Sequence, residues 1–179
     1  MKLTPEQLYN IFVHRKGVFA LQNPNGSYFP IKRNITLDDI KEHLKGEKTV
    51  GVYCLDTDNS VKWACVDLDG KDLKLLYMQG MIIFKTFSDF PTMLEFSGRK
   101  GFHIWIFFNP SVPANYAQQL VKARLNRIEL NFYEVFPKQT ELNETRLYGN
   151  LVKLPMALHR VNGKRSKILK MNKMEALLK

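Results

Sequence analysis

The sequence contains few cysteines and no long apolar segment, and these absences exclude several classes of protein. Its two cysteines among 179 residues, Cys54 and Cys65, lie in apolar, strand-like contexts without C-x-x-C spacing. We expect reduced core thiols in a cytoplasmic protein, and we expect no zinc. No apolar run approaches the length of a membrane span, and the N-terminus lacks the apolar core of a signal peptide. A membrane is therefore not an expected partner.

Acidic residues are also scarce, because 17 Asp and Glu stand against 27 Lys and Arg for a net charge of +10. Residues 145–179 carry nine basic residues and one acid, so the first 144 residues contribute only +2. A concentrated basic segment predicts contact with nucleic acid. A solvated surface or a disordered basic tail is the alternative. The predicted nucleic-acid contacts are Arg160, Lys164, Arg165 and Lys167.

Internal repeats, low-complexity tracts and convincing linkers are absent, and a 45% share of hydrophobic residues is enough for a core. Turn signals, helix caps and apolar periodicity predict an α/β protein with a largely antiparallel sheet in two closely packed lobes. Helices are expected at 4–14, 36–46, 71–89, 113–130 and 171–178. Strands are expected at 17–21, 28–31, 50–55, 61–66, 92–108 (with a turn inside), 132–136 and 151–154, with hairpin turns at 56–59 and 161–164.

Two carboxylates, Asp67 and Asp69, end an apolar strand that begins near Trp63. Residues i and i+2 of a strand project from the same face, so the two side chains should lie side by side. Paired carboxylates suit Mg²⁺ or Mn²⁺. The alternative is a strand end whose carboxylates meet solvent or cap the helix that follows.

A small basic turn follows in the sequence at Ser97-Gly98-Arg99-Lys100-Gly101, with His103 just inside the next strand. Glycines allow the backbone to approach a ligand closely, and consecutive N–H groups form an anion-binding nest. The turn therefore predicts a phosphate site. Arg99 and Lys100 could instead point outward, and His103 could be a core histidine.

Two further charged residues lie in apolar strands, Glu134 and Lys153. Glu134 is a candidate third metal ligand, because two-metal phosphoryl transfer needs several carboxylates. A salt bridge to a neighbouring lysine is its alternative role. Lys153 needs an anionic partner if it is buried, which a nucleotide phosphate, Glu134 or an aspartate would supply. Of the aromatic residues, only Tyr148, in a polar loop, is a candidate for base stacking.

These residues resemble the motifs of the archaeo-eukaryotic primase superfamily, the primase-polymerases of mobile elements, conflict systems and CRISPR-linked proteins. Residues 66–69 are similar to its h-D-h-D/E motif, residues 97–103 to its S-G-x-x-G-x-H motif, and Tyr133-Glu134 to its h-D/E motif. Residues 136–139, which follow Tyr133-Glu134, belong to the same h-D/E match. Residues 43–46, 51–53 and 148–155 also resemble one branch of the superfamily, so the likeness covers nearly the whole chain. Many relatives have Asp where this chain has Glu134.

The resemblance implies a two-lobed fold with an RRM-like, largely antiparallel catalytic sheet flanked by helices. It implies a catalytic core at 1–170, with an N-terminal lobe of about 1–60 and a metal and nucleotide lobe of about 61–170. Residues 171–179 would then begin a C-terminal helix or a linker to an absent domain. It assigns Asp67, Asp69 and Glu134 to catalysis and two divalent metals. It assigns the incoming nucleotide to Ser97, Gly98, Arg99, Lys100, His103, Lys153 and His159.

The function implied is template-dependent transfer of nucleotides from nucleoside triphosphates to a 3′-hydroxyl, with de novo primer synthesis as a further activity to test. A metal-dependent nuclease on the same carboxylates is one alternative. A catalytically inactive module that binds single-stranded nucleic acid is another. The expected partners are a single-stranded DNA template and primer, nucleoside triphosphates, and further domains or a CRISPR or replication protein.

Overall fold

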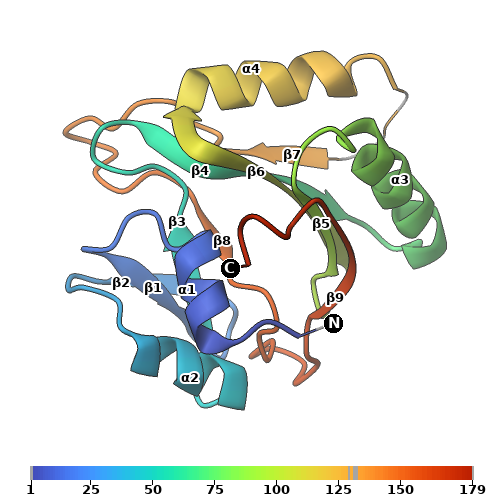
Figure 1. The fold of residues 1–179 in the computed structure, drawn as a ribbon. Helices are drawn as coiled ribbons and strands as arrows, with labels where there is room; N and C mark the ends of the chain where they lie inside the picture. The colour runs from blue at the N-terminus through green and yellow to red at the C-terminus, as the bar shows by residue number, and fades with distance from the viewer. Residues whose placement is uncertain (1, 129, 131–132, 179) are drawn as a thin grey trace.

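The computed structural model describes residues 2–128, 130 and 133–178. Along the described residues each helix is followed by two or three strands, and Figure 1 shows their arrangement. The elements are α1 (Pro5–Phe12), β1 (Phe19–Gln22), β2 (Tyr28–Ile31), α2 (Leu37–Lys45), β3 (Val50–Tyr53), β4 (Ser60–Asp69), α3 (Leu73–Thr86), β5 (Thr92–Phe96), β6 (Gly101–Pro113), α4 (Ala114–Leu125), β7 (Tyr133–Phe136), β8 (Leu151–Lys153) and β9 (Lys167–Asn172).

Two antiparallel sheets organise the molecule. The first has the strand order β2-β1-β3-β8 and the second has the order β7-β4-β6-β5-β9. Helices α3 and α4 pack on one face of the second sheet, and α1 and α2 lie beside the first (Figure 1). The predicted fold class, α/β with largely antiparallel sheets, is confirmed. None of the described helices is long and apolar enough to cross a membrane.

Short-range signals set the helix ends. The Thr4 side chain accepts a hydrogen bond from the Gln7 N–H, and Thr36 and Asp39 form the same reciprocal capping box at α2. Gly46 ends α2 with a φ of 90°, which favours glycine. The helix predicted at 113–130 is shorter, because α4 ends at Leu125 and a turn follows.

The hairpin predicted from strands 50–55 and 61–66 is wrong. The turn exists, since the Asp56 N–H donates to the Ser60 carbonyl over 3.0 Å. However, β3 pairs with β1 and β8, whereas β4 pairs with β6 and β7. The turn therefore carries the chain from one sheet to the other. A local turn signal does not determine which strands become partners when both edges of β3 are paired elsewhere.

The C-terminal helix predicted at 171–178 is also wrong. Residues 167–172 form β9, which pairs with β5, and the N–H groups of Leu177 and Leu178 both donate to the Met174 carbonyl in a turn. Ile168 is only 5% exposed in β9. The strand covers the edge of β5, which would otherwise leave backbone groups unpaired.

The predicted lobe at 61–170 supplies most of the second sheet, but it also supplies β8 to the first. Phe132, the predicted first residue of the strand at 132–136, lies outside the described residues.

Alternation along the central strands separates two faces of the second sheet. An added Cβ at Gly80 of α3 would contact Leu68, Leu94 and Ile104, so these residues face the helix layer. The alternate residues point to the opposite face. Trp63 and Trp105 lie there, fully buried against each other and beneath α1, and the Trp63 indole N–H donates to the Phe12 carbonyl. The polar end of this second face carries the site.

Candidate active site

A cavity of about 230 Å³ lies between the two sheets, at the end of β4. Asp67 and His103 reach it from the second sheet, and Lys153 reaches it from β8 of the first. The segments that carry them are far apart in the sequence. Most of the residues predicted for metal and nucleotide binding line this one cavity, namely Asp67, Asp69, Ser97, Arg99, Lys100, His103, Lys153 and His159.

A row of ionisable side chains crosses four strands at this point. Asp67 of β4 is opposite Glu134 of β7 on one side and opposite His103 of β6 on the other, and His103 is opposite Glu95 of β5. Residues directly opposite in an antiparallel pair project from the same face. The sheet register therefore brings Glu134, Asp67, His103 and Glu95 together in that order.

Asp67 is the central acid of the row. Its Oδ1 is buried without a hydrogen-bond partner among the described residues, and it lies 3.7 Å from His103 Nε2. Burial raises the pKa of Asp67, the carboxylates of Asp69 and Glu134 raise it further, and the His103 ring opposes them. A buried carboxylate oxygen in such surroundings is suited to a cation.

The other two predicted metal ligands are held in ion pairs. Lys100 Nζ lies 2.9 Å from an oxygen of Asp69, and Lys138 Nζ lies 2.8 Å from an oxygen of Glu134. The ion pair of Glu134 is the alternative role that its sequence context indicated. Both pairs are largely exposed, so each is weak and exchangeable.

The three predicted ligands do not converge on one point. Within the described parts of the chain, a group of three side chains that could hold a metal occurs at His14, Asp56 and Asp58. Their ligand atoms lie within 4.8 Å of one another. That group lies before the start of β4, whereas Asp67 and Asp69 lie at its end. The pair of aspartates, not a complete triad, is therefore the best-formed part of the candidate metal site.

Glu95 orients His103, and the sequence interpretation did not include it. Glu95 is fully buried, and its Oε2 accepts hydrogen bonds of 3.0 Å from His103 Nδ1 and from Trp105 Nε1. Nδ1 is then the protonated nitrogen, and Nε2 faces Asp67. Burial alone would lower the pKa of His103, but the carboxylates of Asp67 and Glu95 outweigh it and raise the pKa.

The turn between β5 and β6 requires both of its glycines. Gly98 has a φ of 90°, and a Cβ there would lie 3.1 Å from the Ser166 backbone nitrogen. At Gly101 a Cβ would overlap the Leu68 carbonyl and the Asp69 carboxylate. The absence of a side chain at Gly101 thus lets the turn lie directly against the acidic end of β4. Arg99 and Lys100 are both exposed at its tip.

Lys153 joins the two sheets at the site. Its side chain is buried, and Nζ donates a close hydrogen bond to the Ser97 carbonyl. Burial lowers the pKa of Lys153, and Glu95 and Asp67 partly offset that effect. His159 lies on the same cavity, where burial followed by the charges of Lys153 and Arg99 lowers its pKa.

Gln22 and Tyr28 also line the cavity, and sequence reasoning missed them. They are directly opposite each other at the ends of β1 and β2. An Asn-Pro-Asn-Gly turn signal lies between them at residues 23–26, so their pairing could have been predicted from the sequence. Nothing in the sequence indicates that this hairpin approaches β4.

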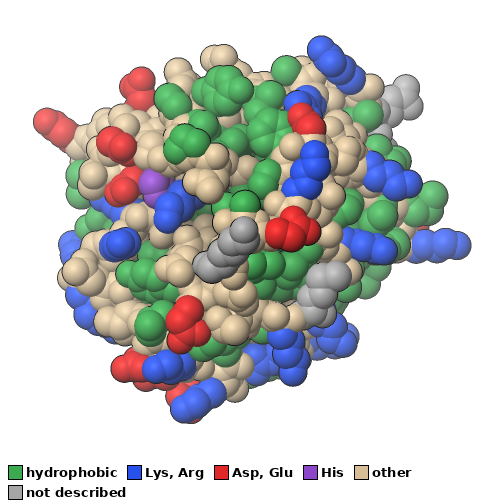
Figure 2. Space-filling model, in the orientation of Figure 1, with side chains coloured by type: hydrophobic (Ala, Val, Ile, Leu, Met, Phe, Trp, Pro, Cys, Tyr) green, Lys and Arg blue, Asp and Glu red, His purple; other side chains and the backbone are tan. Residues whose placement is uncertain are grey.

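The basic C-terminal segment divides into two groups. The Arg165 guanidinium donates to the carbonyls of Leu44 and Met156 over 2.7 and 2.9 Å, and Arg160 donates to the Glu47 carbonyl. Lys164 and Lys167 are exposed. Nucleic-acid contact by these four residues stays a prediction. Figure 2 shows Lys and Arg side chains spread over one face of the molecule among acidic ones, not gathered in one patch.

Comparison with known proteins shows the family to which the chain belongs. No curated protein matches the chain. A family model described as the archaeo-eukaryotic primase domain of the TOTE conflict system matches residues 6–177. That match includes both sheets and every residue of the cavity described above. The chain belongs to this family of archaeo-eukaryotic primase domains and is a member of the primase-polymerase superfamily.

Proposed function

We propose that the chain is a template-dependent primase-polymerase that transfers nucleotides from nucleoside triphosphates to a 3′-hydroxyl. The observation that carries the proposal is the placement of Asp67 and His103 in one cavity with the Ser97–Gly101 turn. Carboxylates that can bind a cation then face a surface that can bind an anion. Membership of the family supports this class of chemistry.

The residues present fit a divalent cation such as Mg²⁺ or Mn²⁺. The unpartnered buried oxygen of Asp67 and the neighbouring carboxylate of Asp69 would hold it, and Glu134 would join them on release from Lys138. In this chemistry the cation neutralises phosphate charge and favours ionisation of the attacking hydroxyl. Oxygen ligands agree with a hard cation, and no zinc is proposed.

The triphosphate would lie along the turn and the first sheet. The backbone N–H groups of the turn, including Gly98, and the Ser97 hydroxyl would orient it, while Arg99 and Lys100 would supply charge. Lys153 would approach from β8, and His159 would donate a hydrogen bond. His103 would donate from Nε2 in its doubly protonated form, which the neighbouring carboxylates favour by raising its pKa. Occupation by phosphate would also compete with Asp69 for Lys100, which would release that carboxylate for the cation.

The direct experiment uses a labelled single-stranded template without a primer, with separate pools of ribo- and deoxynucleotides, in Mg²⁺ and in Mn²⁺. A primed template is run in parallel. Products longer than the primer, or new products on the unprimed template, support the proposal. Shortening of the labelled strand would indicate a nuclease, and binding without any product would indicate an inactive binding module.

A further inference from the structure

A second hollow of about 730 Å³ adjoins the active-site cavity. It is formed by the loop between β7 and β8 together with Tyr53 of β3. Leu151 lines both hollows, so they lie next to each other at the start of β8. The groove reaches the acidic row as well, because Lys138 lines it and pairs with Glu134, which is opposite Asp67.

An aromatic ring is fixed on this groove. The Tyr148 ring lies 5.5 Å from the Tyr53 ring at an angle of 46°, and the Arg15 guanidinium lies 5.4 Å from its centre. Arg15 is itself held, since it donates to the Leu147 carbonyl over 2.9 Å. Aromatic rings that are held in place beside an open groove are suited to stacking against nucleobases, whatever the sequence.

The groove also carries positive charge. Lys138 and Arg146 are exposed and line it. The two acids of the same loop, Glu141 and Glu144, are exposed but do not line the groove. Cations beside a stacking ring form the combination that binds single strands through both phosphate and base.

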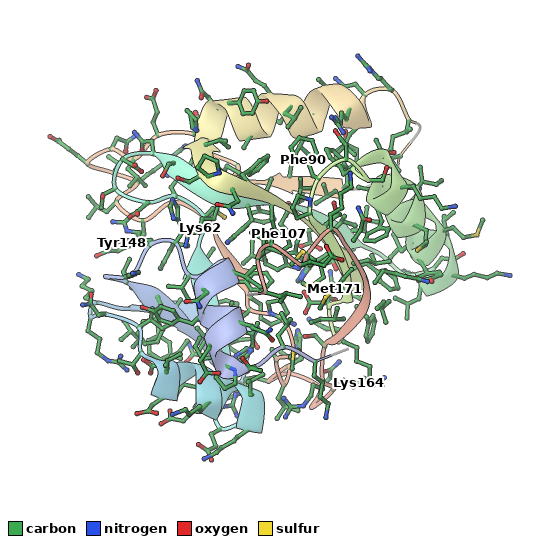
Figure 3. The ribbon with its side chains drawn as sticks, viewed as in Figure 1. Lys62, Phe90, Phe107, Tyr148, Lys164 and Met171 are labelled. Carbon is green, nitrogen blue, oxygen red and sulfur yellow. The ribbon has the colours of Figure 1, made fainter. Side chains whose placement is uncertain are left out.

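We propose that this groove binds single-stranded nucleic acid next to its reacting end, with a base on Tyr148 and phosphates on Lys138 and Arg146. The inference rests on the proposed function and gives it a path for the strand. In contrast, Arg160 and Arg165 of the C-terminal segment bind backbone carbonyls. Figure 3 shows Tyr148 and Lys164 on opposite sides of the molecule, so the two surfaces can be tested separately.

The test measures binding of a fluorescent single-stranded oligonucleotide by anisotropy, with EDTA and no nucleotides, so that no reaction occurs. Tyr148→Ala is expected to weaken binding about tenfold, and Tyr148→Phe, which keeps the ring, is expected to bind as the parent does. Arg146→Gln should lower the slope of log affinity against log salt by about one. The matched control is Lys85→Gln, which removes one exposed positive charge from α3, on the face of the second sheet opposite the site, and should change affinity less than twofold.

Unchanged affinity in Tyr148→Ala, or an equal loss in Lys85→Gln, would overturn the proposal, as would an absence of binding by the parent protein. Thermal unfolding identifies any variant that fails to fold, and Arg146→Gln, an exposed change, then decides alone. A failure of the groove proposal can be distinguished from a failure of the proposed function. Binding that depends on Tyr148 without nucleotide incorporation supports the groove only, and incorporation with no effect of Tyr148→Ala on binding supports the function only.

Discussion

A buried carboxylate, Glu95, holds the histidine that faces the central acid of the site. Its oxygen accepts from both His103 and Trp105, so one side chain links the polar row to the apolar core. The arrangement protonates His103 on Nδ1 and directs Nε2 toward Asp67. The site is therefore pre-oriented by the interior of the second sheet.

Two substitutions of Glu95 distinguish the effect of its hydrogen bonds on stability from the effect of its charge. Glu95→Ala leaves two buried donors unpaired, and we expect it to lower the free energy of unfolding by roughly 2–5 kcal/mol. Glu95→Gln keeps an acceptor at the same place and should lose less than half as much. Urea denaturation of both variants measures the difference. Equal losses in the two variants would show that the hydrogen bonds to Glu95 do not stabilise the fold.

Gly101 has no room for a side chain, because a Cβ would overlap the Leu68 carbonyl and the Asp69 carboxylate. Gly101→Ala should therefore push the turn away from β4, with a loss of about 1–3 kcal/mol in unfolding free energy and a loss of any nucleotide binding. Gly17→Ala is the control, since the nearest atom to its Cβ would be 3.9 Å away. Denaturation and nucleotide titration test both variants, and a Gly101→Ala protein that binds nucleotide normally would contradict the proposed position of the turn.

At the level of residues, sequence identified side chains whose chemistry is unusual for their local context. Asp67 and Asp69 were found because two acids at i and i+2 end an apolar strand, and the structure places both on the cavity. Glu95 was missed because it lies outside the motifs, and its own strand does not show which residue lies opposite it. Only the register of β5 against β6 shows that it is opposite His103.

Among the elements, α2 is attached through His43 to β3 and to the segment that follows β8, and these two strands are neighbours in the first sheet. The buried His43 ring accepts from the Val50 N–H at Nδ1 and donates from Nε2 to the Pro155 carbonyl. The bond from the Val50 N–H needs the neutral ring, because a protonated Nδ1 cannot accept. Burial lowers the pKa of His43 from 6.5 to about 4.

This lowered pKa predicts a loss of stability in acid. The folded state binds the proton less well than the unfolded state, so the contribution of His43 is complete above pH 6.5 and is lost as the pH falls toward 4. The loss amounts to about 3 kcal/mol. Urea denaturation of the parent and of His43→Gln between pH 7 and 4 should give a steeper pH dependence for the parent. Parallel curves would contradict this assignment.

The packing of β9, which ends inside the segment predicted as a C-terminal helix, can be tested by substitution. Ile168 is buried in β9, so Ile168→Ala should lower the unfolding free energy by roughly 2–5 kcal/mol. Lys167→Ala, at its exposed neighbour, should change it by less than about 0.5 kcal/mol. Thermal or urea denaturation compares the two. Similar small effects would mean that β9 does not pack on the second sheet.

The elements differ in how far sequence determines them. Caps at Thr4 and Thr36 act within a few residues, and they predicted α1 and α2 correctly. The partner of a strand depends on distant segments, and the hairpin predicted around residues 56–59 was therefore wrong. The segment at 171–178 was predicted as a short helix, because the sequence does not show that its first residues pair with the distant strand β5.

At the scale of the whole molecule, two sheets from different parts of the chain meet around one cavity. The hydrogen bond from Lys153 to the Ser97 carbonyl links them at the site, and the turn at 56–59 links them along the chain. The predicted α/β class was correct, and most of the residues that the sequence singled out for metal and nucleotide binding lie on this cavity. The sequence did not predict that the two sheets face each other across the cavity, or that Gln22 and Tyr28 line it.

The most direct test of the proposed nucleotide transfer is the activity of Asp67→Ala. The variant is assayed for nucleotide incorporation on a primed single-stranded template. Asp67 is the central acid of the row, so we expect at least a 100-fold loss of incorporation, with oligonucleotide binding within threefold of the parent. Asp38→Ala, which removes an exposed acid on α2, is the matched control and should retain full activity. Incorporation by Asp67→Ala at the rate of the control would contradict the account.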